Sequence, residues 1–318
     1  MNHRDDLQRR ISSAIYAGIL GDALGVPVEH STRHELSLVS VKNMLGFGRY
    51  DQPAGTWSDD TSLVLCTMES LLRGYDPDDM ARTFCRWMFE SYWTATGFVF
   101  DAGVTTFLAL ERFRSGTMSA RECGGATEDD CGNGALMRML PAAVYFRNEP
   151  AEKLLEKVHD VAAITHAHPR NLIACGLYSL IIAELCRGVP KEQALGGAVE
   201  TARAYYQGDR FVNELPHFRR ILSGESAGLD RSHISSSGYV VDTLEASLWC
   251  FLRHTSTREV LLSAVNLGLD TDTTGMVAGG LAGACHGLDG IPGEWPASLA
   301  RKEEIDELVD SFVRGVTQ

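Results

Sequence analysis

Apolar residues recur at intervals of three and four along most of this chain, which is the spacing of one face of an α-helix. Clear examples follow Asp60, where leucine, valine and methionine repeat up to residue 73, and Pro169, where an apolar stretch runs to Arg187. The strict alternation of apolar and polar residues that marks a half-buried β-strand is scarce. The pattern therefore predicts an all-α protein.

Glycine and proline divide the predicted helices, and they cluster at 25–30, within 31–56, at 115–134 and within 207–238. No internal repeat and no clear linker separate one part of the chain from another, so we expect a single domain over residues 1–318. The predicted helices cover residues 7–24, 61–73, 76–89, 103–114, 136–147, 151–165, 169–187 and 191–206, a segment around 244–252, and a glycine-rich segment after residue 274.

Two of the predicted helices carry small residues on one face. These are Ala14, Gly18, Gly21 and Gly25 in the first helix, and Gly275, Gly279 and Gly283 in the glycine-rich helix. Glycines four apart allow two helix backbones to approach closely, as they do in membrane helix pairs. We expect no stretch to reach the apolar length that spans a bilayer, so the two helices should pack together inside a protein core.

The charge balance argues against binding to nucleic acid. The formal net charge is −13, and no run of lysine or arginine offers a basic surface for a polyanion. The apolar share of 44% is ordinary for a globular protein, and a chain of 318 residues can bury a large core. The excess of acidic residues is compatible with carboxylates that bind cations.

The cysteines and the start of the chain indicate a cytoplasmic protein. The eight cysteines form no C-x-x-C pair, which favours free thiols in a reducing compartment over disulfides or a zinc site. Two arginines before the apolar stretch 11–20 faintly resemble a signal peptide, but acidic residues at 5, 6 and 22 interrupt that pattern.

Two acidic stretches, far apart in the chain, carry the strongest chemical signal. They offer oxygen donors only, which suit Mg²⁺, Mn²⁺ or Ca²⁺ better than zinc. Four carboxylates balance the charge of two divalent cations, so the pattern points to a binuclear site. The donors are Ser58, Asp59 and Asp60 in the first stretch, and Asp270, Asp272 and Thr273 in the second.

Each acidic stretch also precedes a predicted helix, and serine and aspartate are preferred N-caps. For either stretch alone, capping is the better interpretation. Because both open onto tightly packed apolar helices, we favour metal binding, although periodicity does not show that they meet.

Several other residues could belong to a site or could have an ordinary structural role. Glu29 follows the first helix but could lie on the surface. Asp101 could cap the next helix, Asn133 lies between glycines and could occupy a turn, and Tyr239 could be a core aromatic. His166, like His168 beside Pro169, could be a cap or a core residue.

Taken together, these motifs resemble the ADP-ribosylglycohydrolase family, including its bacterial dinitrogenase reductase-activating members. The matches follow the family's order from about residue 11 to residue 295 and are specific only as a set. They are Gly18–Gly25 with Glu29, Gly55–Ser62, Phe100–Gly103, Gly132–Gly134 with Met137, Arg138 and Pro141, Thr165–Pro169, Ser237–Leu244 and Asp270–Gly275.

The resemblance implies a compact, orthogonal multi-helix fold with two Mg²⁺ or Mn²⁺ ions in a cleft. The metal ligands would be Ser58, Asp59, Asp60, Asp270, Asp272 and Thr273. Ser58 stands where threonine is more usual, and it keeps the hydroxyl. Asp101 and Glu29 would be the catalytic carboxylates. The substrate contacts would come from Gly103, Asn133, Gly134, His166 and Tyr239.

The resemblance also implies hydrolysis of the α-glycosidic bond between ADP-ribose and a protein side chain, with release of ADP-ribose. Arginine is the favoured acceptor, because an acidic pocket suits a guanidinium. Val104, however, replaces an asparagine of the arginine-specific enzymes, which leaves serine-linked ADP-ribose and O-acetyl-ADP-ribose as alternatives. A catalytically inactive relative that binds ADP-ribose is a further alternative. The expected partners are an ADP-ribosylated protein and ADP-ribose, without nucleic acid or membrane.

Overall fold

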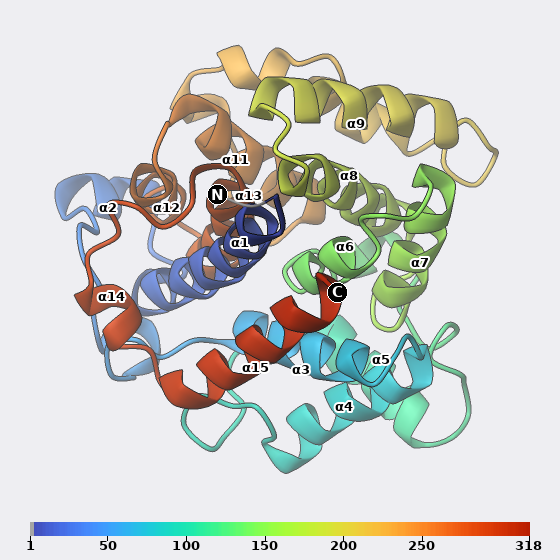
Figure 1. Cartoon of the computed structure of the whole chain (residues 1–318), viewed down its shortest axis with the longest axis horizontal. Coiled ribbons are helices and arrows are strands. Elements are labelled where there is room, and N and C mark those ends of the chain that lie inside the picture. Colours follow the sequence, from blue (N-terminus) through green and yellow to red (C-terminus); the bar gives the residue numbers. More distant parts are fainter. Residues whose placement is uncertain (1–2) are drawn as a thin grey trace.

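The computed structural model describes residues 3–318, which form helices joined by turns and loops (Figure 1). Within these residues no β-strand forms, and β-type pairing is confined to isolated bridges. The all-α prediction is confirmed. The α-helices are α1 (His3–Gly25), α2 (Arg33–Leu38), α3 (Asp59–Leu72), α4 (Pro77–Glu90), α5 (Val104–Arg114), α6 (Leu140–Tyr145), α7 (Ala151–Ala163), α8 (Pro169–Cys186), α9 (Lys191–Tyr205), α10 (Arg219–Leu222), α11 (Val240–Arg253), α12 (Thr257–Val265), α13 (Thr271–His286), α14 (Glu294–Ala297) and α15 (Lys302–Val316).

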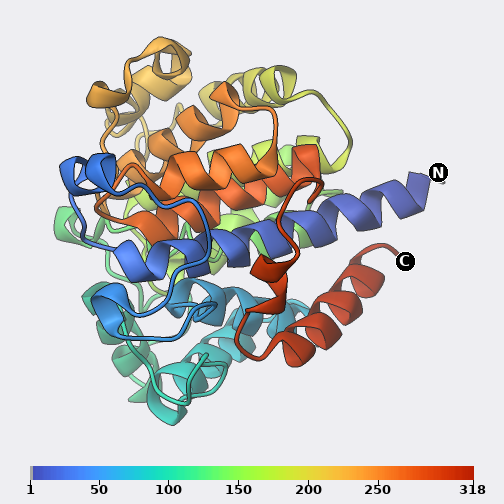
Figure 2. The ribbon, with the colours of Figure 1, turned by 90° about the vertical axis from the view of Figure 1, so that its left-hand side faces the viewer.

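Helices α1 and α13 lie side by side through the middle of the molecule (Figures 1 and 2). A Cβ atom on Gly21 would lie 2.1 Å from the carbonyl oxygen of Gly275, and one on Gly279 would lie 2.3 Å from that of Ala17. Any side chain at these positions would force the two backbones apart, so glycine is required. The predicted close packing of the two small-residue helices is confirmed.

The other helices surround this pair. Helices α8, α11 and α12 pack against α13, whereas α15 packs against both α1 and α3. One hydrophobic cluster extends from α1 to α15. The two ends of the chain lie on the same side of the molecule (Figure 2), where the Gln8 amide donates a hydrogen bond of 2.9 Å to the Thr317 hydroxyl.

Some helix boundaries differ from those predicted. The helix expected at 136–147 is shorter, because α6 begins at Leu140; Pro141, which lacks an N–H group, occupies its first turn. Helices α2, α12 and α15 were not among the predicted elements. Helix α15 nevertheless carries a helical signal, because Ile305, Val309 and Phe312 recur on its buried face.

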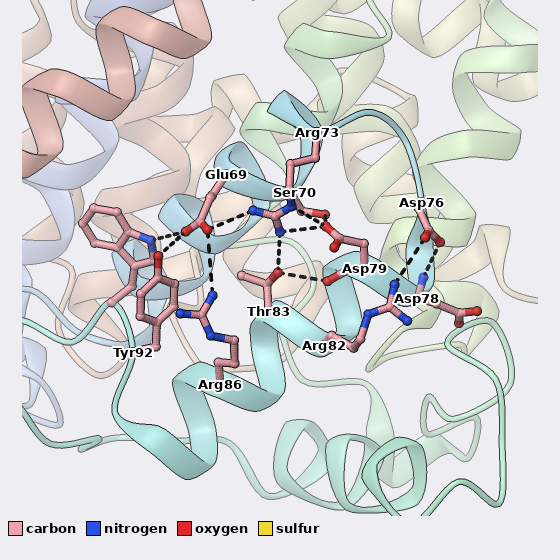
Figure 3. Close-up of polar contacts among 11 residues, drawn as sticks. Glu69, Ser70, Arg73, Asp76, Asp78, Asp79, Arg82, Thr83, Arg86 and Tyr92 are labelled. Atoms are coloured by element: carbon pink, nitrogen blue, oxygen red, sulfur yellow. Dashed lines mark hydrogen bonds and ion pairs between the residues drawn. The ribbon is translucent and has the colours of Figure 1, made fainter.

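The corner between α3 and α4 is held by a polar network (Figure 3). The Arg73 guanidinium donates to the Asp79 carboxylate at 2.7 Å and to the Glu69 carboxylate at 2.9 Å. Glu69 also accepts hydrogen bonds from the Tyr92 hydroxyl at 2.7 Å and from the Trp93 indole at 2.6 Å. The network ties the C-terminal half of α3 to α4 and to the loop after it, leaving the N-terminus of α3 for the site described below.

The expectation that no stretch is apolar enough to span a membrane was wrong. By length and composition, two helical segments could do so, Arg4–Val28 and Pro169–Cys186. In the folded chain, however, 83% and 89% of their most apolar windows are buried. Their apolar surfaces are therefore used for packing within the fold, which a count of apolar residues does not reveal.

The eight cysteines are all free thiols, as predicted. Burial raises the pKa of the Cys175 and Cys250 thiols to about 12, so both stay protonated near neutral pH. These thiols act as small apolar core residues.

Candidate active site and metal centre

Six carboxylates from four separate segments meet at one end of the α1–α13 pair. The close approach of the two helices places Gly25, at the end of α1, against the backbone of Asp272, where a Cβ atom would lie 2.3 Å from the amide nitrogen. The Thr271 hydroxyl also donates to the Gly25 carbonyl oxygen at 2.8 Å. The carboxylates are Glu29 from the turn after α1, Asp59 and Asp60 from the first turn of α3, Asp101 from the loop before α5, and Asp270 and Asp272 from the start of α13.

Asp22 fastens the N-terminus of α3 to α1. This fully buried carboxylate accepts hydrogen bonds from the Ser58 amide at 3.0 Å, the Thr61 amide at 3.0 Å and the Thr61 hydroxyl at 2.6 Å. Burial raises the pKa of Asp22 to about 6, although these hydrogen bonds act in the opposite direction. The sequence interpretation did not assign Asp22 to the site. An acidic residue within the apolar part of α1, after residue 10, was the signal that could have found it.

Capping explains only part of the acidic pattern. Ser58 is the N-cap of α3, where its hydroxyl accepts the Asp60 amide at 3.2 Å. Asp270 holds the equivalent position of α13, but its side chain makes no capping hydrogen bond. Asp101 does not cap α5 either, because the N-cap there is Gly103. The carboxylates of Asp270 and Asp101 are therefore free for another role.

The carboxylates are held in surroundings that disfavour their charged form. Burial, and then repulsion from neighbouring carboxylates, raises the pKa of Asp59, Asp60 and Asp272 well above the usual range. The pKa of Glu29 rises to about 8 through burial and the nearby Asp101. No lysine or arginine lines the cavity into which the cluster opens. Since buried charges need compensation, the cluster must bind either protons or cations.

The donor atoms fit hard divalent cations. Asp60 Oδ2 and Asp270 Oδ1 are buried and have no hydrogen-bond partner within residues 3–318. One carboxylate oxygen from each of Glu29, Asp101 and Asp272 lies within 4.8 Å of the others. Oxygen-only clusters with unpartnered atoms are the ligand sets that Mg²⁺ and Mn²⁺ prefer. The geometry also groups Glu29 and Asp101 with a predicted ligand, although the sequence interpretation gave both a catalytic role only.

The cluster opens into a cavity of about 260 Å³ that most of the predicted site residues line. Thr105, Thr106, Asp129, Gly132, Met137 and Gly238 also line it and were not predicted. The predicted residues at the cavity wall are Glu29, Asp59, Asp60, Asp101, Gly103, Asn133, Gly134, His166, Asp270 and Thr273.

The other three predicted residues lie apart from the cavity wall. Ser58 caps α3 through the Asp60 amide and does not line the cavity. A carboxylate oxygen of Asp272 lies within 4.8 Å of one from Glu29, but Asp272 does not line the cavity either. The Tyr239 hydroxyl approaches His217 Nδ1 at 3.5 Å, and its backbone forms an isolated bridge with Gly132.

Comparison with known proteins connects this geometry to one family. The sequence model of the ADP-ribosylglycohydrolase family matches residues 3–318. The chain belongs to the ADP-ribosylglycohydrolase family. This confirms the resemblance that was drawn from the motifs.

Individual relatives are similar to this chain over more than nine tenths of its length. An ADP-ribosylarginine hydrolase, Tri1, of Pseudomonas putida (strain GB-1) is 31% identical over 95% of this chain and 77% of the relative. An ADP-ribosyl-[dinitrogen reductase] glycohydrolase of Rhodospirillum rubrum is 32% identical over 92% of each chain. A solved structure, described as an ADP-ribosylglycohydrolase-related protein complex, has a TM-score of 0.81 and 34% identity, covering 98% of this chain and 99% of that one.

Asn133 connects the cavity wall to the acidic cluster. Its amide nitrogen donates to Asp270 Oδ2 at 2.8 Å and to the Thr243 hydroxyl at 2.9 Å. Its backbone N–H donates to the Gly238 carbonyl oxygen at 3.0 Å. Asn133 is therefore more than a turn residue, because it orients the Asp270 carboxylate and leaves Oδ1 of that group free.

The two histidines of the 165–169 segment have different roles. His168 caps α8, with its Nδ1 accepting the Arg170 amide at 3.2 Å. His166 lines the cavity, and its ring lies so close to Gly134 that a Cβ there would be 2.7 Å from Cε1. Burial and the nearby Arg138 lower the pKa of His166 to about 3, so the ring is neutral.

Tyr50 is a further residue that the sequence interpretation missed. Its hydroxyl donates a hydrogen bond to Glu29 Oε2, and its ring centroid lies 5.1 Å from that of Phe100, beside Asp101. His30 Nε2 lies 3.4 Å from Glu29 Oε1. Tyr50 follows a stretch of glycines and polar residues without periodicity, so nothing in the sequence marked it.

Proposed function

We propose that this ADP-ribosylglycohydrolase uses two divalent cations to hydrolyse the α-glycosidic bond between ADP-ribose and an arginine side chain of a modified protein. The observation that carries this proposal is the largely buried cluster of six carboxylates, which has unpartnered oxygens and opens into a cavity that no lysine or arginine of residues 3–318 lines. Such a cluster is costly to bury without cations, so its presence supports an active enzyme over an inactive relative.

Arginine is the proposed acceptor for two reasons. The Pseudomonas putida relative is described as an ADP-ribosylarginine hydrolase, and the Rhodospirillum rubrum relative as acting on ADP-ribosyl-dinitrogen reductase. A guanidinium carries a planar positive charge, and carboxylates such as Asp101 and Glu29 are its natural partners.

The residues proposed to hold Mg²⁺ or Mn²⁺ are Ser58, Asp59, Asp60, Asp270, Asp272 and Thr273. The bound cations would supply Lewis-acid polarisation of the ribose hydroxyls and of water. The chain itself keeps these donors in place, because Asn133 orients Asp270 and the Thr273 hydroxyl bonds Asp60 Oδ1 at 3.3 Å.

Asp101 and Glu29 are proposed to move the protons. Water adds to C1″ of the ribose while the bond from C1″ to the arginine nitrogen breaks. One of the two carboxylates accepts the proton that the water loses, and the other provides a proton to the departing nitrogen. Tyr50 holds Glu29 in place for this role. Gly103, Asn133, Gly134, His166 and Tyr239 remain the proposed substrate contacts.

A second candidate is hydrolysis of O-linked ADP-ribose, either serine-linked or O-acetyl-ADP-ribose. Val104, which lines the cavity next to Asp101, favours it, because a valine side chain offers no hydrogen bond to a guanidinium. We also propose a cytoplasmic location, since the free buried thiols fit a reducing compartment, and no role in binding nucleic acid, given the net charge of −13.

The test follows free ADP-ribose released from arginine-linked and serine-linked ADP-ribosyl peptides, with Mg²⁺, Mn²⁺ or a chelator. We expect cation-dependent release from the arginine peptide, lost in Asp272→Ala and kept in Glu307→Ala, an exposed carboxylate on α15. Release from serine alone would transfer the proposal to O-linked substrates. No release from either peptide, with no cation bound in calorimetry, would leave an inactive binding protein.

A further inference from the structure

The start of α5 carries an exposed apolar face at the mouth of the cavity. Val104, Phe107 and Leu108 are 72%, 41% and 44% exposed, and their spacing places them on one side of the helix. Phe98, in the preceding loop, is 48% exposed. Val104 also lines the cavity itself, so this apolar face is continuous with the candidate active site. The outward face of a surface helix is ordinarily polar, and a contiguous apolar face marks an interaction site.

Beyond Phe107 the apolar face leads into a groove between α4 and α5, which lie next to each other in Figure 1. The groove has a volume of about 670 Å³. The ring centroids of Phe89 and Phe107 lie 6.1 Å apart. The Arg114 guanidinium lies 4.0 Å from the Phe89 centroid. The groove is lined by Cys85, Phe89 and Phe113, by one carboxylate, Glu90, and by Arg82, Arg86 and Arg114.

Three arginines against one carboxylate, Glu90, give this groove a basic character on a chain whose net charge is −13. Arg114 is paired with Glu111 at 2.6 Å. Arg82 and Arg86 have only longer contacts to carboxylates, of 3.4 Å to Asp76 for the first and 3.9–4.0 Å for the second. The guanidinium groups of Arg82 and Arg86 can therefore pair with a carboxylate of another protein.

We propose that this face of α5 and the α4–α5 groove dock the modified protein through a segment next to its ADP-ribosylated side chain. The segment would be apolar close to the modified residue and acidic farther away. The proposal rests on the function proposed above, because a protein whose side chain enters the cavity beside Val104 must lie across α5. Eleven residues of helix extend about 16 Å, which about five residues of extended chain can follow.

Three arginine-linked ADP-ribosyl substrates test this proposal. One peptide has leucine and phenylalanine on both sides of the modified arginine with glutamates beyond, a second has glycine and serine there, and the third is ADP-ribosyl-agmatine. We expect the first peptide to have a kcat/KM roughly tenfold above the second, through a lower KM. The double variant Phe107→Glu/Leu108→Glu should remove that preference without changing turnover of ADP-ribosyl-agmatine. Leu38→Glu, which alters a still more exposed leucine on α2, should keep the preference.

Equal efficiency for the two peptides in the wild type, or an equal loss for all three substrates in the double variant, would overturn the docking proposal. So would a double variant that turns a dimer into a monomer and leaves peptide preference intact, because the face would then bind a second copy of the chain. No release from any of the three substrates would contradict the proposed function itself.

A separate observation concerns His166 at the cavity wall and two buried side chains behind it, Arg138 and Thr165. The Arg138 guanidinium is fully buried, forms no ion pair within residues 3–318, and donates to the Thr165 hydroxyl oxygen at 2.7 Å. That oxygen lies 2.8 Å from His166 Nδ1. His166 Nε2 has no hydrogen-bond partner among the same residues and lies near Gly134, where a Cβ would be 3.3 Å away.

The direction of these hydrogen bonds follows from the donors. A guanidinium only donates, so the Thr165 oxygen accepts from Arg138 and its proton is available to His166 Nδ1. If Nδ1 donated instead, the buried Thr165 proton would have no acceptor. A neutral ring with Nδ1 accepting carries its proton on Nε2. We infer that Arg138 and Thr165 are positioning residues that hold His166 as an Nε2 donor toward an oxygen of bound ADP-ribose.

The inference is tested by the tautomer of His166 and by binding of ADP-ribose. Correlation spectra of ¹⁵N-histidine-labelled wild type should show the proton on Nε2. Thr165→Val should mix the tautomers and weaken ADP-ribose binding about tenfold, as expected for a lost buried hydrogen bond, and Thr165→Ser should restore both. Thr67→Val removes an equally buried hydroxyl that bonds only within α3, so it should change neither.

A proton on Nδ1 in the wild type, or wild-type affinity for ADP-ribose in Thr165→Val, would overturn the inference. The tautomer can be measured without any ligand. Absence of ADP-ribose binding by the wild type would therefore count against the proposed function separately.

Discussion

The middle of the α1–α13 pair and the cavity at its end are built from the same two helices but are packed in opposite ways. In the middle, glycine allows the two backbones to touch, and every residue of α13 from Thr274 to Ala284 is buried. At the end, buried carboxylates repel one another and two of their oxygens have no partner. The first region stabilises the fold. The second is destabilising while its carboxylates are charged, and bound cations or protons remove that repulsion. The candidate site lies where the packing is least favourable, next to a helix pair packed tightly enough to hold it.

The largest effect should come from removing one buried carboxylate. Asp60→Asn keeps the size of the side chain and removes a charge that its neighbours repel. We expect hydrolysis to fall about 1,000-fold or more, as when a group that stabilises the transition state is lost, while thermal stability in chelator stays equal or rises. Rates of ADP-ribose release and melting temperatures measure both. A lower melting temperature in chelator would mean that this carboxylate supports the fold.

The opposite result is expected in the middle of the helix pair. Gly21→Val would place atoms where the Gly275 carbonyl group lies, so the helices must separate. We expect the free energy of unfolding in urea to fall by about 3 kcal/mol, the upper range for overpacking. An unchanged stability would show that the α1–α13 contact is not as tight as the structure has it.

Cations should stabilise the protein only through the cavity. Mg²⁺ or Mn²⁺ at a hundred times its dissociation constant should raise the free energy of unfolding by about 2.7 kcal/mol. Melting curves with and without chelator would show this increase for the wild type and for Glu307→Ala, but not for Asp60→Asn. An equal increase in Asp60→Asn would place the cation elsewhere.

Asp22 belongs to both regions, since it lies on α1 and holds the first turn of α3. Asp22→Asn keeps the side-chain shape but replaces one accepting oxygen by a donor facing the Ser58 and Thr61 amides. We expect cation affinity or hydrolysis to fall roughly 10- to 100-fold, as for other residues that orient metal ligands. Calorimetric titration with Mn²⁺ measures the affinity directly. Wild-type affinity would show that the position of α3 does not depend on this carboxylate.

The smallest effect should be a gain in stability away from both regions. Gly197 lies inside α9, and no other atom lies within 4 Å of the place where a Cβ would be added. Gly197→Ala should therefore raise the free energy of unfolding by about 0.5–1 kcal/mol through helix propensity. If Gly197→Ala lowered the free energy of unfolding instead, the free space around each glycine would not explain the different effects expected for Gly197→Ala and Gly21→Val.

Many residues of the candidate site could be predicted because they occur in short motifs. The motifs did not show which of these residues line the cavity and which support it from outside. Four of the predicted aspartates and Asn133 line one cavity, namely Asp59, Asp60, Asp101 and Asp270 with Asn133. Tyr50 and Asp22 could not be assigned, because their importance lies in contacts with Glu29 and Ser58 that no local pattern records. Tyr239 shares a motif with the site, but its side chain approaches His217 instead of the cavity wall.

The sequence alone determined the helical class, the pairing of the two small-residue helices and the family. These depend on periodicity and on short motifs, both of which are local in the chain. Only the tertiary structure decided which oxygens remain unpartnered, that Glu29 and Asp101 lie with Asp272, and that the apolar helices Arg4–Val28 and Pro169–Cys186 are buried within the fold. The reason is physical: desolvation, charge repulsion and hydrogen-bond satisfaction depend on which distant segments meet.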